Sequence, residues 1–157
     1  MTDSEAAADP DSTSVTLVVR RLISATADTL FDAWTKPADL MSWWGPGGVA
    51  CPEAQVDLRV GGRCRIANRF PDGVVWILWE FEVIEPPHKL VYTWRLEQSS
   101  GASERVTVRF EPRDNATEVI VIHERIRDVA TRDRHEHGWH GCLDGLAEYV
   151  GKGSGAL

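Results

Sequence analysis

Hydrophobic and polar residues alternate through the middle of the chain, which predicts a series of half-buried β-strands. In segment 74–84, one face carries Val75, Ile77, Trp79, Phe81 and Val83, whereas Glu80 and Glu82 share the other. Turn-forming residues such as Gly61-Gly62 and Asp114-Asn115 separate the segments, so consecutive strands are expected to pair as hairpins in an antiparallel meander. The predicted strands are 15–23, 50–58, 63–70, 74–84, 89–96, 104–111 and 116–124.

Three other segments place hydrophobic residues at helical spacing. Thr26 is the expected N-cap of a first short helix, and Pro37 begins a second one that ends near Trp43. The longest helix is predicted over 132–150, with one apolar face made of His135, Trp139, Cys142, Leu143, Leu146, Tyr149 and Val150. Gly138, Gly141 and Gly145 border this face. Glycines are costly inside a helix, so they indicate either that the sheet approaches closely there or that space is left open.

This order of elements predicts a single α+β domain over residues 15–150. Its curved antiparallel sheet wraps around a long C-terminal helix, and two short helices follow the first strand. A sheet that curls around one helix tends to leave a cavity between the two. Residues 1–14 are expected to form a disordered tail, and the Gly-rich end 151–157 is expected to fray.

The net charge limits the partners that the protein is expected to bind, and the pattern of apolar residues limits its expected location. The chain has 157 residues and a formal net charge of −7, which is unfavourable for binding nucleic acid or an anionic membrane, so neither is expected as a partner. It carries no apolar run long enough to cross a bilayer, and its N-terminus lacks a signal-peptide pattern. A cytoplasmic location is therefore expected.

Five motifs follow one another in the order seen in a known protein family. They are Phe31-Asp-Ala-Trp34-Thr-Lys-Pro37 with Trp43-Trp44-Gly45-Pro46, Asp57-Leu-Arg59-Val-Gly61-Gly62-Arg63, Pro86-Pro87-His-Lys-Leu90-Val91-Tyr92-Thr93-Trp94, His123-Glu124, and His135-Glu-His-Gly138-Trp139. Together they resemble proteins related to the activator of the heat-shock-protein-90 ATPase, in the START-like (SRPBCC) superfamily.

The resemblance implies a helix-grip fold with a hydrophobic pocket between the sheet and the C-terminal helix. It implies less about activity, because the superfamily includes carriers, polyketide cyclases, sequestering proteins and co-chaperone domains, and a fold does not set a function. The co-chaperone role usually rests on an additional N-terminal domain, so the resemblance implies no such activity for this chain.

Aromatic residues and two histidines on inward faces are the candidate ligand-binding groups. His123 shares a strand face with Val119 and Val121, and His135 lies on the apolar face of the long helix. Such a histidine can hydrogen-bond a ligand or act as acid or base, or it can be a core residue bonded to a backbone carbonyl. The predicted lining is Trp44, Trp79, Phe81, Tyr92, Trp94, Phe110, His123, His135 and Trp139.

No metal site and no cofactor are expected from the sequence. On a helix, His135 and His137 project roughly 160° apart, so they cannot share a metal ion. Glu136 and His140 are neighbours at i,i+4 but have no third ligand in view.

The leading functional hypothesis is non-covalent binding of a small hydrophobic or aromatic molecule in the cavity, for transport, sequestration or sensing. One alternative is a cyclase- or aromatase-like enzyme that uses His123 or His135 as acid or base and Tyr92 as a donor. Another is a protein-interaction module. In that case Ile120 and Ile122, expected to be exposed on the outer face of the sheet, would contact a partner or form a homodimer.

Overall fold

A computed structural model describes residues 14–45, 49–99 and 101–155. Its strands form one antiparallel sheet in the order β1-β7-β6-β5-β4-β3-β2. The strands are β1 (Val15–Ile23), β2 (Ala54–Val56), β3 (Arg63–Phe70), β4 (Gly73–Glu85), β5 (Lys89–Leu96), β6 (Glu104–Arg113) and β7 (Ala116–Ile126). This is the curved meander that the alternation predicted.

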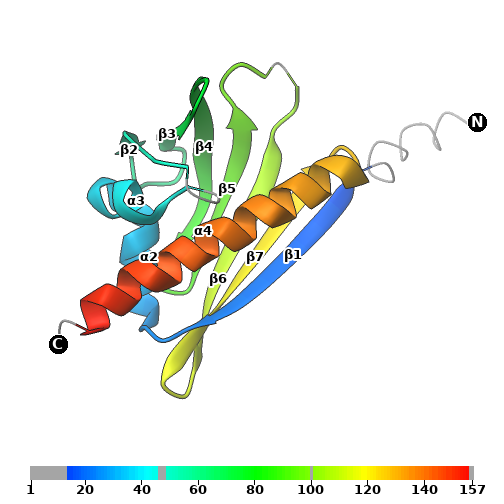
Figure 1. Cartoon of the computed structure of the whole chain (residues 1–157). Coiled ribbons are helices and arrows are strands. Elements are labelled where there is room, and N and C mark those ends of the chain that lie inside the picture. Colours follow the sequence, from blue (N-terminus) through cyan, green and yellow to red (C-terminus); the bar gives the residue numbers. More distant parts are fainter. Residues whose placement is uncertain (1–13, 46–48, 100, 156–157) are drawn as a thin grey trace, which may run out of the picture.

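The helices are α2 (Ala27–Thr35), α3 (Pro37–Trp43) and α4 (Val129–Gly155). Figure 1 shows α4 lying diagonally across one face of the sheet, with α2 and α3 beside its C-terminal half. The Thr26 side chain accepts a hydrogen bond from the backbone N–H of Thr29, and Pro37 begins α3, both as predicted. No described helix is long and apolar enough to span a membrane.

The predicted strand 50–58 is wrong over most of its length. Only β2 and an isolated bridge between Ala50 and Arg69 pair with β3. Pro52 lies between these two contacts, and because it has no N–H group it cannot extend a ladder of backbone hydrogen bonds.

A register shift in β4 changes which residues face the core. Phe81 pairs with Tyr92, but Val83 pairs with Val91, so Glu82 is an extra residue in the strand. Val83 therefore leaves the face that it was predicted to share with Phe81, and Ile84 packs against the core in its place. Alternation within one strand cannot reveal this bulge, because it is defined by the neighbouring strand.

Helix α4 is longer at both ends than the predicted 132–150. It begins at Val129 because the Asp128 side chain accepts a hydrogen bond from the backbone N–H of Thr131. Residues 151–155, expected to fray, continue the helix. The predicted tail over 1–14 lies outside the described residues, apart from Ser14.

Trp34 of α2 fills the middle of the space between the sheet and α4. It is fully buried, and its ring contacts those of Trp43, Trp44, Phe110 and Trp139. Its indole N–H donates to the Tyr92 hydroxyl, with 3.2 Å between nitrogen and oxygen. A buried indole with a hydrogen-bond acceptor combines apolar packing with a satisfied polar group. Trp34 therefore limits how much open space the curled sheet leaves.

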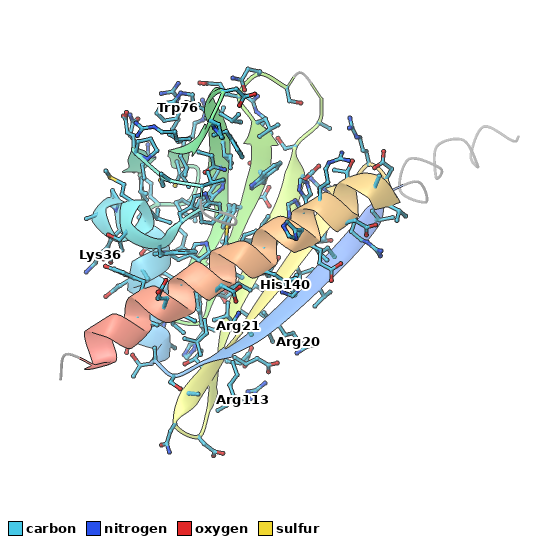
Figure 2. All side chains as sticks on the ribbon, in the orientation of Figure 1. Arg20, Arg21, Lys36, Trp76, Arg113 and His140 are labelled. Carbon is cyan, nitrogen blue, oxygen red and sulfur yellow. The ribbon has the colours of Figure 1, made fainter. Side chains whose placement is uncertain are left out.

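Arginine–carboxylate pairs cover the outer face of the sheet. Arg20 and Arg113, which are labelled in Figure 2, both form ion pairs with Glu118. Ile120, predicted to be exposed, is only 8% exposed, because Arg20 and Arg109 flank it on the neighbouring strands and long arginine stems cover apolar surface. The expectation of an exposed Ile120 is therefore wrong, and Ile122 is half-buried. The homodimer stays a prediction.

Candidate functional site

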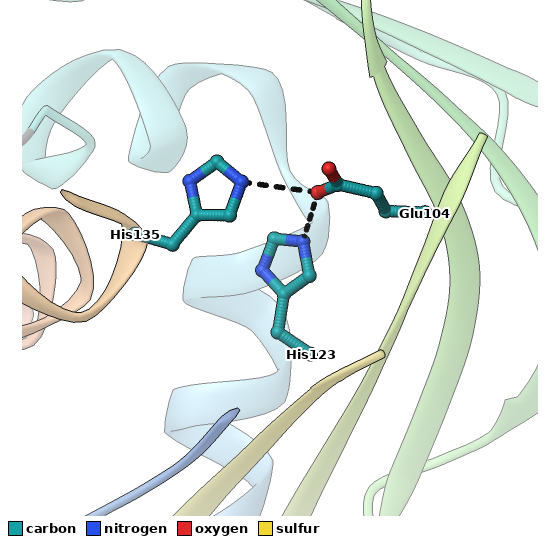
Figure 3. A group of neighbouring side chains, drawn as sticks. All are labelled: Glu104, His123 and His135. Atoms are coloured by element: carbon teal, nitrogen blue, oxygen red, sulfur yellow. Dashed lines mark hydrogen bonds and ion pairs between the residues drawn. The ribbon is translucent and has the colours of Figure 1, made fainter. Parts of the chain in front are cut away.

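Three titratable side chains from three elements meet at one end of α4. Glu104 begins β6, His123 lies on β7, and His135 lies in the second turn of α4. Figure 3 shows both imidazoles converging on Oε1 of Glu104, at 2.6 Å from His123 Nε2 and 3.0 Å from His135 Nε2. The imidazole rings are stacked, with centroids 4.6 Å apart. Trp94 makes a T-shaped contact with each of the two rings.

The hydrogen bond from Trp139 determines which ring nitrogen of a neutral His123 is protonated. Its indole Nε1 donates to His123 Nδ1 at a distance of 3.0 Å, and an indole N–H can only donate. The Nδ1 atom must therefore present its lone pair, so a neutral His123 carries its proton on Nε2 and donates it to Glu104. His123 is thus held in one tautomer, with both ring nitrogens engaged.

The same contacts shift two pKa values. Burial by itself would raise the pKa of Glu104, but the hydrogen bonds from His123 and His135 outweigh burial and lower it to about 2. Burial lowers the pKa of His123, and the hydrogen bond to Glu104 only partly opposes this. Glu104 is therefore ionised and His123 neutral at physiological pH.

Two histidines and a carboxylate also form a set of donors that could hold a metal ion, with the three ligand atoms within 4.8 Å of one another. A metal-bound histidine nitrogen must present its lone pair, and the other ring nitrogen normally donates its N–H outward. His123 has the opposite arrangement, since Nδ1 accepts from Trp139 and Nε2 keeps the proton. The donor types fit a metal, but the protonation pattern does not. His140 lies on the exposed side of α4 (Figure 2), away from this cluster.

A cavity of about 150 Å³ lies beside the cluster, between α4 and the inner face of the sheet. Three indole rings, from Trp44, Trp94 and Trp139, form much of its wall. The Trp44 indole N–H donates to Asn68 Oδ1 at 3.0 Å. The other lining residues are Asn68, Ile77, His123, Arg134, His135, Gly138 and Cys142. The wall thus combines apolar and aromatic surface with a few polar groups, among them Asn68, Arg134 and the two histidines.

The residues predicted to bind ligand fall into two groups. Trp44, Trp94, His123, His135 and Trp139 line the cavity. Trp79, Phe81, Tyr92 and Phe110 do not. They are buried in the aromatic core, where Tyr92 stacks on Trp79 with ring centroids 4.0 Å apart and Phe110 contacts Trp34. The reason is Trp34, whose ring lies between Phe110 and the cavity-lining Trp139. Whether the five lining residues bind a ligand stays a prediction.

Three polar residues at this site were not predicted from the sequence, although two of them carried a usable signal. Glu104 lies two and four residues before the inward-facing Val106 and Val108 in the same strand, so this acidic residue shares their buried face. Asn68 lies two residues after the buried Ile66 in β3 and therefore shares its face of the strand. Arg134 had no such signal, because it is exposed and lies one residue before the predicted apolar face begins at His135.

The curved antiparallel sheet and the long C-terminal helix define a helix-grip fold. A family model described as "Activator of Hsp90 ATPase homolog 1-like protein" matches residues 24–151, and the chain belongs to this family. This confirms the resemblance noted in the sequence. No curated protein matches the chain.

Solved structures share the fold over most of the chain. A protein from Chromobacterium violaceum is 24% identical, covers 86% of this chain and 96% of its own, and has a TM-score of 0.79. An AHSA1 protein from Silicibacter pomeroyi is 26% identical, covers 87% and 98%, and has a TM-score of 0.78. CalU16 from Micromonospora echinospora is 20% identical, covers 86% and 75%, and has a TM-score of 0.67.

Proposed function

We propose that the protein binds a small aromatic molecule in the cavity beside His123 and His135, without changing it covalently. The observation that carries this proposal is the pocket of about 150 Å³ lined in part by Trp44, Trp94 and Trp139. Apolar cavities of this size accept a single benzene ring, and aromatic walls favour a flat ligand through stacked and edge contacts. The ligand we propose is therefore a one-ring compound rather than a polycyclic one.

The hydrogen-bond contacts of the candidate catalytic groups favour binding without a covalent reaction. The Tyr92 hydroxyl is fully buried and accepts from Trp34, so it is remote from a ligand. His123 has a partner on each ring nitrogen. Of the two imidazoles, His135 alone keeps a nitrogen, Nδ1, without a hydrogen-bond partner among the described residues. One such group can orient a ligand, but acid–base catalysis of a cyclisation needs an acid and a base.

The proposal is tested by titrating the protein with phenylacetamide, a neutral one-ring probe, and following the indole N–H signals by NMR. We expect saturable shifts at Trp44, Trp94 and Trp139 with one site per chain, and a probe of unchanged mass after incubation. Gly138→Leu should weaken binding at least about ten-fold, because Gly138 lines the cavity and a leucine there would occupy it.

Gly151→Leu is the matched control, since Gly151 lies on the same helix and an added Cβ would meet no other packed element of the described chain within 4 Å. It should bind phenylacetamide as the wild type does. Absence of saturable shifts in the wild type, or equal affinity in Gly138→Leu, would refute the proposal. Recovery of a chemically altered probe would favour the enzyme instead.

A further inference from the structure

A second hollow of about 430 Å³ adjoins the cavity and opens toward the start of α4. The two spaces share three wall residues: Trp94, Arg134 and His135. The second hollow is bordered by the end of β5, the segment before β6 and the segment between β7 and α4. Its remaining wall contains Arg95, Arg125, Arg127 and Glu104 among smaller residues. The two spaces are therefore neighbours, and the second one is rich in arginine.

The arginines of this hollow differ from those elsewhere in the protein. Most arginines pair with a carboxylate of the described chain, as Arg20, Arg65 and Arg105 do. Four arginines form no ion pair with a described carboxylate: Arg69, Arg95, Arg125 and Arg134. Three of these four line the hollow, and Arg69 does not.

This concentration of unpaired positive charge contrasts with the protein as a whole, whose formal net charge is −7. Arg127 is already paired with Asp128, and Glu104 is the one carboxylate among the described residues that line the hollow. Arg95 and Arg134 also help to lower the pKa values of Glu97 and Asp128, which lie outside that lining. Glu104 is itself engaged by His123 and His135. The hollow therefore has an excess of positive charge that suits an anionic group.

Arg134 is placed to connect such an anion with the inner cavity. Its one hydrogen bond within the described chain runs from Nη2 to Thr131 Oγ1, at 3.1 Å. A guanidinium group has five N–H donors in a planar fork, and two parallel donors match the two oxygens of a carboxylate. Most of the hydrogen-bonding capacity of Arg134 is therefore available to a ligand.

We propose that the ligand class is an aromatic carboxylate: its ring occupies the cavity between Trp44, Trp94 and Trp139, and its carboxylate binds Arg134, supported by Arg125 and Arg95. This inference rests on the proposed function, because it assigns a charged group to the molecule whose ring the cavity accepts. The apolar wall selects the ring, and the arginines select the charge.

The test compares phenylacetate with phenylacetamide, which has the same ring and nearly the same shape but no charge. We expect phenylacetate to bind about ten-fold more tightly or better, since hydrogen bonds between charged groups exceed neutral ones by about this factor. Added salt should weaken phenylacetate alone. Arg134→Gln should abolish the preference of the protein for phenylacetate over phenylacetamide. Arg69→Gln, which removes the unpaired arginine outside the hollow, should change neither affinity.

Each outcome separates this inference from the proposed function. If phenylacetamide binds in the cavity but phenylacetate binds no better, or Arg134→Gln weakens both equally, the aromatic carboxylate is refuted and cavity binding stands. If acetate competes with phenylacetate at equal concentration, the hollow is an anion site that does not select the ring, which also refutes the inference. If neither aromatic probe binds, both proposals fail.

Discussion

At the scale of single residues, the site depends on where one proton lies. His123 accepts from Trp139 and donates to Glu104, and this chain of hydrogen bonds links α4, β7 and β6. Adding a second proton to His123 would bring two N–H groups face to face at Nδ1. Trp139 therefore acts both as a wall of the cavity and as the residue that keeps the neighbouring imidazole neutral.

We predict that wild-type His123 is a neutral Nε2–H tautomer at physiological pH, and that Trp139→Phe raises its pKa. The substitution removes the indole N–H, so Nδ1 becomes free to take up a proton. Long-range ¹H–¹⁵N NMR of the imidazole rings during a pH titration measures both the tautomer and the pKa. Trp94→Phe is the control, because Trp94 contacts His123 through its ring. Identical titration of His123 in the wild type and in Trp139→Phe would contradict the assignment.

At the scale of elements, the glycines of α4 have two different roles. Gly138 lines the cavity, where space is left open. At Gly145 an added Cβ would lie 2.8 Å from the backbone carbonyl oxygen of Trp43, a distance that requires a shift of one of the two helices. Close approach of the sheet and open space were the two alternatives predicted for these glycines. Both occur, at different glycines, and the element that approaches is α3 rather than the sheet.

We therefore predict opposite effects on stability for two Gly→Ala changes on one helix. Gly145→Ala should destabilise the protein by roughly 1–3 kcal/mol, because α3 must move away from α4. Gly151→Ala should stabilise it by up to about 1 kcal/mol, because alanine favours the helix and open space surrounds position 151. Urea unfolding of the two variants measures this difference. Stabilisation by both substitutions would mean that α3 and α4 are not in close contact.

At the scale of the whole molecule, the buried cluster couples folding to pH. The folded-state pKa of Glu104 is about 2 against an ordinary value of 4.5, so the unfolded chain binds a proton at Glu104 that the folded protein does not between these values. The folded-state pKa of His123 is also lowered, from an ordinary value of 6.5. As the pH falls below 6.5, His123 is therefore protonated in the unfolded chain before it is protonated in the folded protein. Both groups therefore make stability fall as pH falls.

We predict that the free energy of unfolding decreases from pH 7 downward, first through His123 and then, between about pH 4.5 and 2, through Glu104. The Glu104 contribution should be on the order of 2–3 kcal/mol. Glu104→Gln should lower stability at pH 7 and flatten the slope below pH 4.5. The control Glu111→Gln alters only a half-exposed contact 3.8 Å from Arg109 and should leave the slope unchanged. An unchanged slope in Glu104→Gln would contradict the assigned role of Glu104.

Local patterns in the sequence were sufficient to predict much of this fold. Strand alternation and helical spacing depend on neighbouring residues, so they revealed the order of the elements and the inward faces of β6, β7 and α4. They also brought Trp94, His123, His135 and Trp139 toward the same interior. Family motifs added the helix-grip class, because five of them occur in one order along the chain.

The tertiary structure alone decided how that interior is divided. The bulge that turns Val83 outward exists only relative to β5, and Glu104 meets His123 and His135 only because β6, β7 and α4 pack in one particular register. Trp34 fills space that Phe110 and Tyr92 were predicted to line. Such features arise from packing between segments far apart in sequence, where volume and hydrogen-bond partners are set jointly, so no periodicity within one segment encodes them.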